Sequence, residues 1–198
     1  MRIHKDQFQN HDMSKLIKGA VVPRPIAWVS TISRDGTRNL APFSFFTVAS
    51  MNPITLCFSV GGGASDKDTL ANIKETGQFI VNIVSESLAN QMHETSLQYS
   101  PEEDEFEKAG TQAEPGDFVD VPRVAESPVQ MECELDQVVE VGTNSLVLGT
   151  VVGYHIHDDV YMEKDKVNPD KLKPVGRMAG DYSYIREFYS LPNNDLPK

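Results

Sequence analysis

The chain is 198 residues long, which suits a single domain, and its 39% apolar and 8% aromatic content is globular rather than disordered. The formal net charge of −11 disfavours binding to nucleic acid or to an anionic membrane surface. No apolar run approaches the roughly 20 residues that span a bilayer, and the polar first residues are unlike a signal peptide. Two cysteines are too few for a disulfide framework, so we expect a reducing, cytoplasmic location.

The charge is unevenly distributed along the chain. Residues 1–76 carry nine Lys or Arg against six Asp or Glu, whereas residues 102–120 carry eight acids against the single base Lys108. The N-terminal third is therefore mildly basic and could hold a small anion. The acidic stretch is typical of a solvated surface helix and loop.

Extended segments dominate the pattern in chain order. Strands are predicted over residues 17–22, 26–33, 54–60, 78–84, 129–141 and 146–158. The dipeptide Asp35-Gly36 indicates a hairpin turn after the second of them. Short helices are predicted over residues 66–76, 85–96 and 100–109. Many strands joined by turns favour a mostly β, antiparallel barrel over a doubly wound sheet.

A glycine-rich loop, Gly61-Gly62-Gly63, leads from a strand into a helix. Glycines let backbone amides approach a ligand, and a helix start offers free N–H groups at the positive end of its dipole. Lys67 adds a charge and Thr69 a hydroxyl donor, which together suit a phosphate monoester. The alternative is an ordinary capped helix, with Asp66 and Asp68 as dipole partners.

Three phenylalanines fall within four positions at Phe43, Phe45 and Phe46. In an alternating strand, Phe43 and Phe45 would share one face, with Ser44 and Phe46 on the other. Such a run packs in a core or forms a wall for a flat heteroaromatic ring. Nearby, two prolines flank Arg24 and fix its backbone, so its guanidinium suits a phosphate or a ring edge; a solvated arginine is the alternative.

Two histidines, His155 and His157, share one face of the strand predicted over residues 146–158. A metal site needs a third ligand, which the neighbouring sequence does not supply, so no metal is predicted. A histidine facing a pocket would suit proton or hydride chemistry, and an exposed strand face is the alternative. The glycines and tyrosines from Gly176 to Tyr184 indicate either a loop that closes over a site or simple packing of the tail.

Four segments match a known family in order and spacing, namely residues 24–31, 39–46, 67–73 and 79–82. Together they resemble the flavin reductase-like, FMN-binding split-barrel family, and the resemblance covers about residues 14–160. The amino-acid sequences of the first two segments are similar to those of flavoredoxins and of the flavin reductase partners of two-component monooxygenases.

The resemblance implies a six-stranded antiparallel Greek-key split β-barrel that dimerises, with FMN near the subunit interface. Residues 1–198 would form one domain, with a barrel core over about 14–160 and a C-terminal extension over 161–198. His155 would face the nicotinamide or the flavin as the catalytic residue. The implied cofactor-binding residues are Arg24, Lys67, Asp68 and Thr69 at the phosphate, Ser44, Phe45, Phe46, Thr47, Ser59 and Trp28 around the ring, and Tyr182 as a closing residue.

These inferences lead to the hypothesis of an FMN-binding oxidoreductase. NADH or NADPH would deliver hydride to flavin N5, and the reduced flavin would serve a monooxygenase or another electron acceptor. An FMN electron carrier that never uses NAD(P)H, and an interaction barrel without flavin, are the alternatives. The resemblance gives no role to the acidic segment at residues 98–120.

Overall fold

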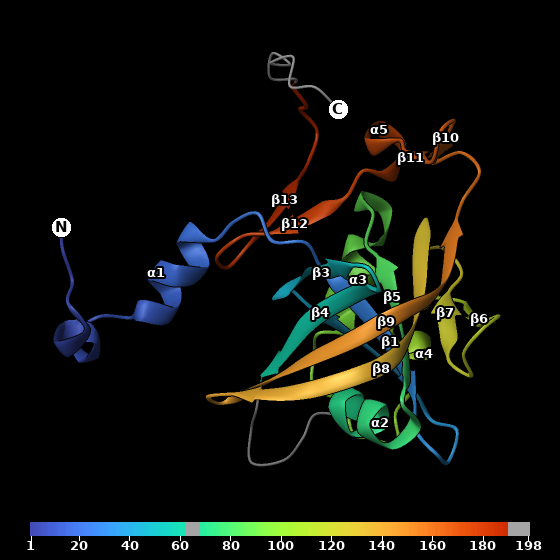
Figure 1. The fold of residues 1–198 in the computed structure, drawn as a ribbon, viewed down its shortest axis with the longest axis horizontal. Helices are drawn as coiled ribbons and strands as arrows, with labels where there is room; N and C mark the ends of the chain where they lie inside the picture. Colours follow the sequence, from blue (N-terminus) through green and yellow to red (C-terminus); the bar gives the residue numbers. More distant parts are fainter. Residues whose placement is uncertain (62–67, 190–198) are drawn as a thin grey trace.

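A seven-stranded antiparallel sheet forms the centre of the protein, and the computed structural model describes residues 1–61 and 68–189 (Figure 1). Its strand order is β2-β1-β5-β8-β9-β4-β3. The strands are β1 (Ala27–Ile32), β2 (Arg38–Phe43), β3 (Phe46–Met51), β4 (Ile54–Gly61), β5 (Gln78–Ile83), β8 (Val129–Val141) and β9 (Asn144–Ile156). Three small hairpins add β6 (Ala113–Pro115) with β7 (Pro122–Val124), β10 (Tyr161–Met162) with β11 (Lys166–Val167), and β12 (Val175–Arg177) with β13 (Tyr182–Tyr184).

Short helices surround this sheet. They are η1 (Lys5–Asn10), α1 (Met13–Ala20), α2 (Asp68–Thr76), η2 (Glu86–Leu88), α3 (Ala89–Glu94), α4 (Glu105–Ala109) and α5 (Pro169–Leu172). In Figure 1, α2 covers one end of the sheet, while α1 projects from the body on the side of β3 and β4. Among the described helices, none has the length and apolar character needed to cross a membrane.

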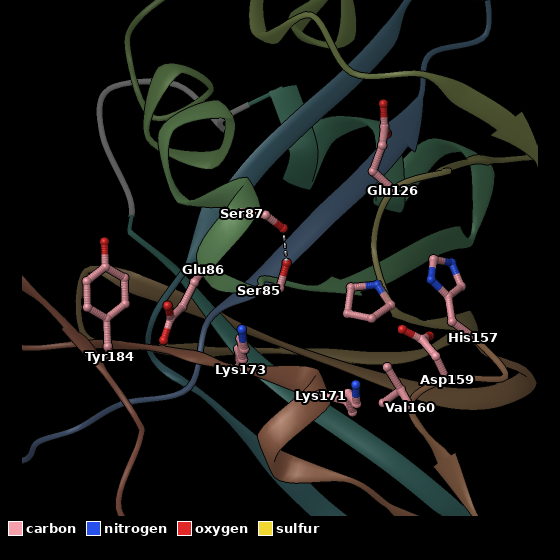
Figure 2. Close-up of a pocket in the computed structure, with 11 residues that line it drawn as sticks. Ser85, Glu86, Ser87, Glu126, His157, Asp159, Val160, Lys171, Lys173 and Tyr184 are labelled. Atoms are coloured by element: carbon pink, nitrogen blue, oxygen red, sulfur yellow. Dashed lines mark hydrogen bonds between the residues drawn. The ribbon is translucent and has the colours of Figure 1, made fainter.

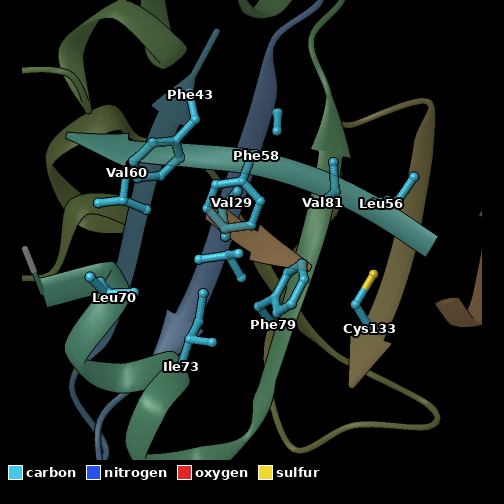
Figure 3. Close-up of a cluster of buried hydrophobic side chains, with 12 residues drawn as sticks. Val29, Phe43, Leu56, Phe58, Val60, Leu70, Ile73, Phe79, Val81 and Cys133 are labelled. Atoms are coloured by element: carbon cyan, nitrogen blue, oxygen red, sulfur yellow. The ribbon is translucent and has the colours of Figure 1, made fainter. Parts of the chain in front are cut away.

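The main core lies inside the curve of the sheet (Figure 3). Phe58 is at its centre, with its ring centroid 5.1 Å from that of Phe43 and 5.5 Å from that of Phe79. From α2, Leu70 and Ile73 close this core. Burying large apolar side chains from strands and helix together is the main favourable term that holds these elements in place.

A second core packs on the outer face of β1 and β2. Trp28 and Leu40 meet Met92 from α3 and Phe106 from α4. Strand β1 is therefore buried on both faces, which explains its unbroken apolar and small-residue sequence.

The strands predicted over residues 54–60, 78–84 and 129–141 are confirmed, but the strand predicted over residues 17–22 is wrong. That segment lies in and just after α1, because the Asp12 side chain accepts a hydrogen bond from the Lys15 N–H at 3.0 Å and begins a helix there. The helix predicted over residues 100–109 begins only at Glu105, with Asp104 as its N-cap.

The sheet has seven strands where six were expected, because the chain bends between β2 and β3. Ser44 and Phe45 lie in this bend and belong to neither strand. Phe43 is consequently buried in the core while the Phe45 ring is 48% exposed, so the predicted shared face of these two rings is wrong.

Candidate functional site

The bend between β2 and β3 presents an exposed aromatic ring beside several hydroxyl groups. The Phe45 carbonyl accepts a hydrogen bond from the Ser59 N–H at 2.8 Å, which ties the bend to β4. In the next residue pair, Phe46 lies opposite Phe58. We call this region the Phe45 surface. The structure brings together here five residues that were predicted to bind the cofactor, namely Ser44, Phe45, Phe46, Thr47 and Ser59.

Arg24 joins the Phe45 surface through its guanidinium, whose central carbon lies 5.7 Å from the centroid of the Phe45 ring. The terminal nitrogens donate to the carbonyl oxygens of Lys18, Val21 and Met178 at 2.7–2.8 Å, so Arg24 also fastens the N-terminal segment to the C-terminal one. Burial, and then the charge of Arg177, lower the pKa of Arg24. Its buried Nε–H has no hydrogen-bond partner in the described part of the chain.

The start of α2 is fixed by a buried polar network. The Thr69 hydroxyl donates to Asn39 Oδ1 at 2.8 Å, and the Asn39 amide donates to Glu105 Oε1 at the same distance. The second oxygen of Glu105 accepts the Leu40 N–H at 3.2 Å. Asp68 begins this helix, and burial raises the pKa of Glu105 to about 7. Lys67 and the preceding loop fall outside the described residues.

Trp28 lies beneath the surface, where its side chain has no solvent exposure. The indole Nε1–H donates to the Thr95 hydroxyl at 2.9 Å, which satisfies its only polar group. In this arrangement the ring supports β1 from the second core and offers a cofactor no surface, contrary to the expectation from the resemblance.

Tyr182 belongs to the β12–β13 hairpin, which reaches Arg24 through the backbone. Arg24 and Arg177 exchange two N–H···O bonds of 3.0 and 2.9 Å. The Arg177 guanidinium carbon lies 4.5 Å from the centroid of the Tyr182 ring, which is 37% exposed. Tyr182 is thus connected to the Phe45 surface through two arginines rather than by direct contact.

His155 is engaged elsewhere in the fold. Its Nε2 lies 2.5 Å from an oxygen of Glu132, a carboxylate with no solvent exposure. Asn144, near the other end of β9, donates to the Ser59 hydroxyl at 2.9 Å. Because Asn144 and His155 stand close to opposite ends of one strand, His155 lies far from the Phe45 surface within a single chain. Its catalytic role stays a prediction.

Asp117, Glu132 and His155 form a cluster that sequence reasoning missed, since they come from a loop and two strands. Their potential ligand atoms lie within 4.8 Å of one another. Glu132 already accepts the N–H groups of Asp117, Phe118 and Val119 at 2.7–2.9 Å. Burial would raise the pKa of Glu132, yet these bonds and that from His155 lower it. The cluster therefore acts as an anchor for the loop before β7.

The amino-acid sequence of this chain matches known proteins over most of its length. Residues 19–171 match the family model described as the flavin reductase like domain. This chain belongs to the flavin reductase-like family. The recognised segments and the structure agree on this point, and membership places the protein among flavin-linked oxidoreductases.

Individual relatives of the flavin reductase-like chain share both sequence and fold. An uncharacterized protein of Aquifex aeolicus (strain VF5) is 43% identical over 176 residues, which cover 88% of this chain and 89% of that protein. Nitrilotriacetate monooxygenase component B from Bacillus cereus is 33% identical with a TM-score of 0.92, covering 96% of this chain and 98% of its own. The Pseudomonas fluorescens 2-nitrobenzoate 2-nitroreductase NbaA is 32% identical with a TM-score of 0.88, covering 100% and 99%.

Proposed function

We propose that the protein binds FMN at the Phe45 surface and acts as an NAD(P)H-dependent flavin reductase. When bound, the flavin supplies the ring that accepts hydride and passes electrons on. The chain's own task is to hold that ring in a fixed position and to exclude water from one of its faces. This explains why no nucleophile or acid–base pair is needed at the Phe45 surface.

The residues present fit such a ring. The 48% exposed Phe45 side chain offers an apolar face for stacking. The half-buried Ser44 and the exposed Thr47 offer hydroxyl donors and acceptors for the polar edge of a heteroaromatic group. A buried N–H without a partner is costly, so a ligand acceptor at Arg24 Nε would relieve that cost.

For the phosphate we propose the start of α2, with Lys67, Asp68 and Thr69. The Thr69–Asn39 bond fixes the first turn of this helix. A fixed helix start keeps its free N–H groups in one orientation, and this favours an anion without further ordering. Lys67 would add the full positive charge that a phosphate monoester requires.

The observation that carries the proposal is the exposed Phe45 ring beside the unpartnered Arg24 Nε–H, in a chain of the flavin reductase-like family. A core phenylalanine would be buried and an ordinary surface arginine would be hydrated. Their juxtaposition fits a flat ligand that covers the ring and offers an acceptor to the arginine.

The test is spectroscopic and kinetic. We expect the purified protein to show flavin absorption or to quench the fluorescence of added FMN, and to oxidise NADH or NADPH when FMN is present. If the protein binds FMN but oxidises neither nucleotide, the reductase function is wrong and the protein is an FMN electron carrier. If the protein shows no flavin absorption and does not quench FMN fluorescence, the alternative of an interaction barrel without flavin is favoured.

We further propose that two copies pair around this site. Helix α1 has no buried residue, and Leu16, Ile17 and Val21 are each about half exposed. On β3, Val48 is 54% and Met51 73% exposed, beside the Phe45 surface. Apolar groups gathered on one side of a molecule in this way mark an interaction site.

The acceptor of the electrons is proposed to be a separate protein. Similarity to the component B of a monooxygenase over nearly the whole chain supports an oxygenase partner that uses reduced flavin. The measurement is oxygenase turnover in the presence of this protein, FMN and the nucleotide.

A further inference from the structure

Two arginines face each other where β12 meets the segment that precedes β1. Arg24 and Arg177 are directly opposite partners in an antiparallel bridge, joined by backbone N–H···O bonds of 3.0 and 2.9 Å. A Cβ at the neighbouring Gly176 would lie 2.8 Å from Cβ of Pro23, so the two segments are in close contact. Directly opposite residues of paired strands project to the same face, so the two arginine side chains are neighbours.

This pairing of like charges is unfavourable by itself. Arg24 is only 6% exposed, and burial and then the charge of Arg177 lower its pKa, with no acid among the described residues opposing them. In the described part of the chain neither guanidinium forms an ion pair, and all of their hydrogen bonds go to backbone carbonyls. Even the nearby Asp181, which is exposed, contributes its carbonyl rather than its carboxylate. Two adjacent positive charges thus stay uncompensated by these residues in a protein of net charge −11.

A second arginine of the C-terminal segment has a different arrangement. The guanidinium carbon of Arg186 lies 4.4 Å from the centroid of the Tyr184 ring. The corresponding distance from Arg177 to Tyr182 is 4.5 Å, so both arginines stack on a tyrosine. Arg186 in addition donates two hydrogen bonds, of 3.0 and 2.9 Å, to Glu86. A stacked arginine of this segment therefore has a carboxylate partner at Arg186 and none at Arg177 among the described residues.

Glu86 and Tyr184 belong to the lining of a pocket of about 630 Å³ (Figure 2). Three carboxylates line it, those of Glu86, Glu126 and Asp159, against the two ammonium groups of Lys171 and Lys173. This lining has no excess of positive charge. Attraction of an anion is therefore expected at the Arg24–Arg177 pair rather than in this pocket.

The Arg177 side chain has donors to spare. Its Nη1 donates to the carbonyls of Gly180 at 2.9 Å and of Asp181 at 3.2 Å. Its Nε and Nη2 donate to no group within residues 1–61 and 68–189. A half-buried, planar guanidinium with free N–H groups suits the oxygens of a phosphate. The buried Arg24 adds a second charge that solvent screens only weakly.

The arginine pair adjoins the proposed flavin ring. The Arg24 guanidinium carbon lies 5.7 Å from the centroid of Phe45, and Arg177 is its backbone partner. A hydride donor that reaches a ring on Phe45 must place its own anionic part nearby. In a nicotinamide dinucleotide that part is the pyrophosphate, which is one ribose away from the nicotinamide.

We propose that Arg177, supported by the charge of Arg24, binds the pyrophosphate of the nicotinamide donor. The inference rests on the proposed reductase function and assigns a residue to its second substrate. Because NADH and NADPH share the pyrophosphate, this contact raises the affinity for both to the same extent. FMN carries a phosphate too, and riboflavin, which lacks it, separates the two sources of phosphate oxygens.

Steady-state kinetics with three hydride donors provide the first measurement. Arg177→Gln should raise the KM for NADH and the KM for NADPH by the same factor, about tenfold, while kcat changes little. N-benzyl-1,4-dihydronicotinamide transfers hydride but has no phosphate, so the wild type and the variant should use it with equal kcat/KM, which also shows that the variant is folded. The matched control is Arg186→Gln, which removes the arginine already paired with Glu86 and should keep the wild-type KM.

Direct binding separates this proposal from the reductase function. By calorimetry with FMN present, ADP-ribose, which has the pyrophosphate but no nicotinamide, should bind the wild type about tenfold more tightly than Arg177→Gln. Either an unchanged KM or an unchanged ADP-ribose affinity in this variant would overturn the proposal. A variant that binds FMN more weakly, but riboflavin and ADP-ribose as the wild type does, would place the FMN phosphate at Arg177 and overturn it as well. If the protein oxidises neither nucleotide but its ADP-ribose affinity depends on Arg177, the reductase function is wrong and the pyrophosphate site stands.

Discussion

At the scale of single residues, Lys67 is the most direct test of the flavin site. Replacing it by alanine removes a charge-assisted contact, so Lys67→Ala should weaken FMN binding by about 1.5–3 kcal/mol. Fluorescence quenching measures this, and Lys5→Ala, which makes the same charge change in η1, should bind FMN as the wild type does. Equal affinity of both variants would place the phosphate elsewhere.

Glu105 couples the acidic segment to the start of α2 through Asn39. Burial raises the pKa of Glu105 from 4.5 to about 7, so the native state holds this proton more tightly than the unfolded chain does. The resulting stability is fully present below pH 4.5 and is lost as pH rises through about 7. The negative charge of Asp68 on α2 raises the pKa of Glu105 further.

We predict that Glu105 changes the slope of the free energy of unfolding against pH. Between pH 5 and pH 8 the free energy of unfolding of the wild type should fall relative to that of Glu105→Gln, which has no proton to lose in this range. Urea denaturation at several pH values measures it. Glu107→Gln, an exposed change on the same helix, should keep the wild-type slope; parallel curves for all three proteins would show that Glu105 does not titrate in this range.

Glu132 is predicted to contribute stability of the opposite pH dependence. Its lowered pKa means that this contribution is present above pH 4.5 and is lost as pH falls through its folded value. Glu132→Gln replaces one charged acceptor of three backbone N–H groups with an amide, so we expect a loss of about 3 kcal/mol at pH 7. Thermal unfolding compares it with Glu134→Gln, an exposed change on the same strand, for which little loss is expected.

At the scale of elements, the packing of β9 against the Phe79 side chain of β5 depends on a glycine. A Cβ at Gly149 would lie 2.2 Å from Cζ of Phe79, an aromatic ring fixed in the main core. Gly149→Ala should therefore destabilise the protein by about 1–3 kcal/mol through overpacking. Gly61→Ala, where a Cβ meets nothing within 4 Å, should leave the denaturation midpoint unchanged. Equal midpoints for the two variants would mean that Phe79 moves aside at little cost.

At the scale of the whole molecule, the exposed apolar side chains predict a dimer. Light scattering should give a mass of twice the 22.0 kDa chain. Ile17→Glu places a charge on the exposed apolar side of α1, so it should shift the protein toward the monomer, because burying an unpaired charge is costly. Lys5→Glu, a change of charge in η1, should remain dimeric. If the wild type is a monomer, the proposal that two copies pair around the Phe45 surface is wrong.

The sequence by itself determined the family and most strands. Periodic apolar residues and turn-forming dipeptides act locally, so β5 and β8 and the Asp35-Gly36 turn follow from short stretches of chain. The same locality explains the error at residues 17–22, because Ile17 and Val21 suggest a strand until the Asp12 cap is weighed against them.

The tertiary structure decided which side chains meet. Glu132 with His155, Asn39 with Glu105, and Ser59 with Asn144 come from elements far apart in sequence, and no local pattern pairs them. The burial of Trp28 and the exposure of Phe45 were decided in the same way, by the second core and by the bend after β2. Residue type determines what a side chain can bind, whereas packing across the sheet determines what it is free to bind.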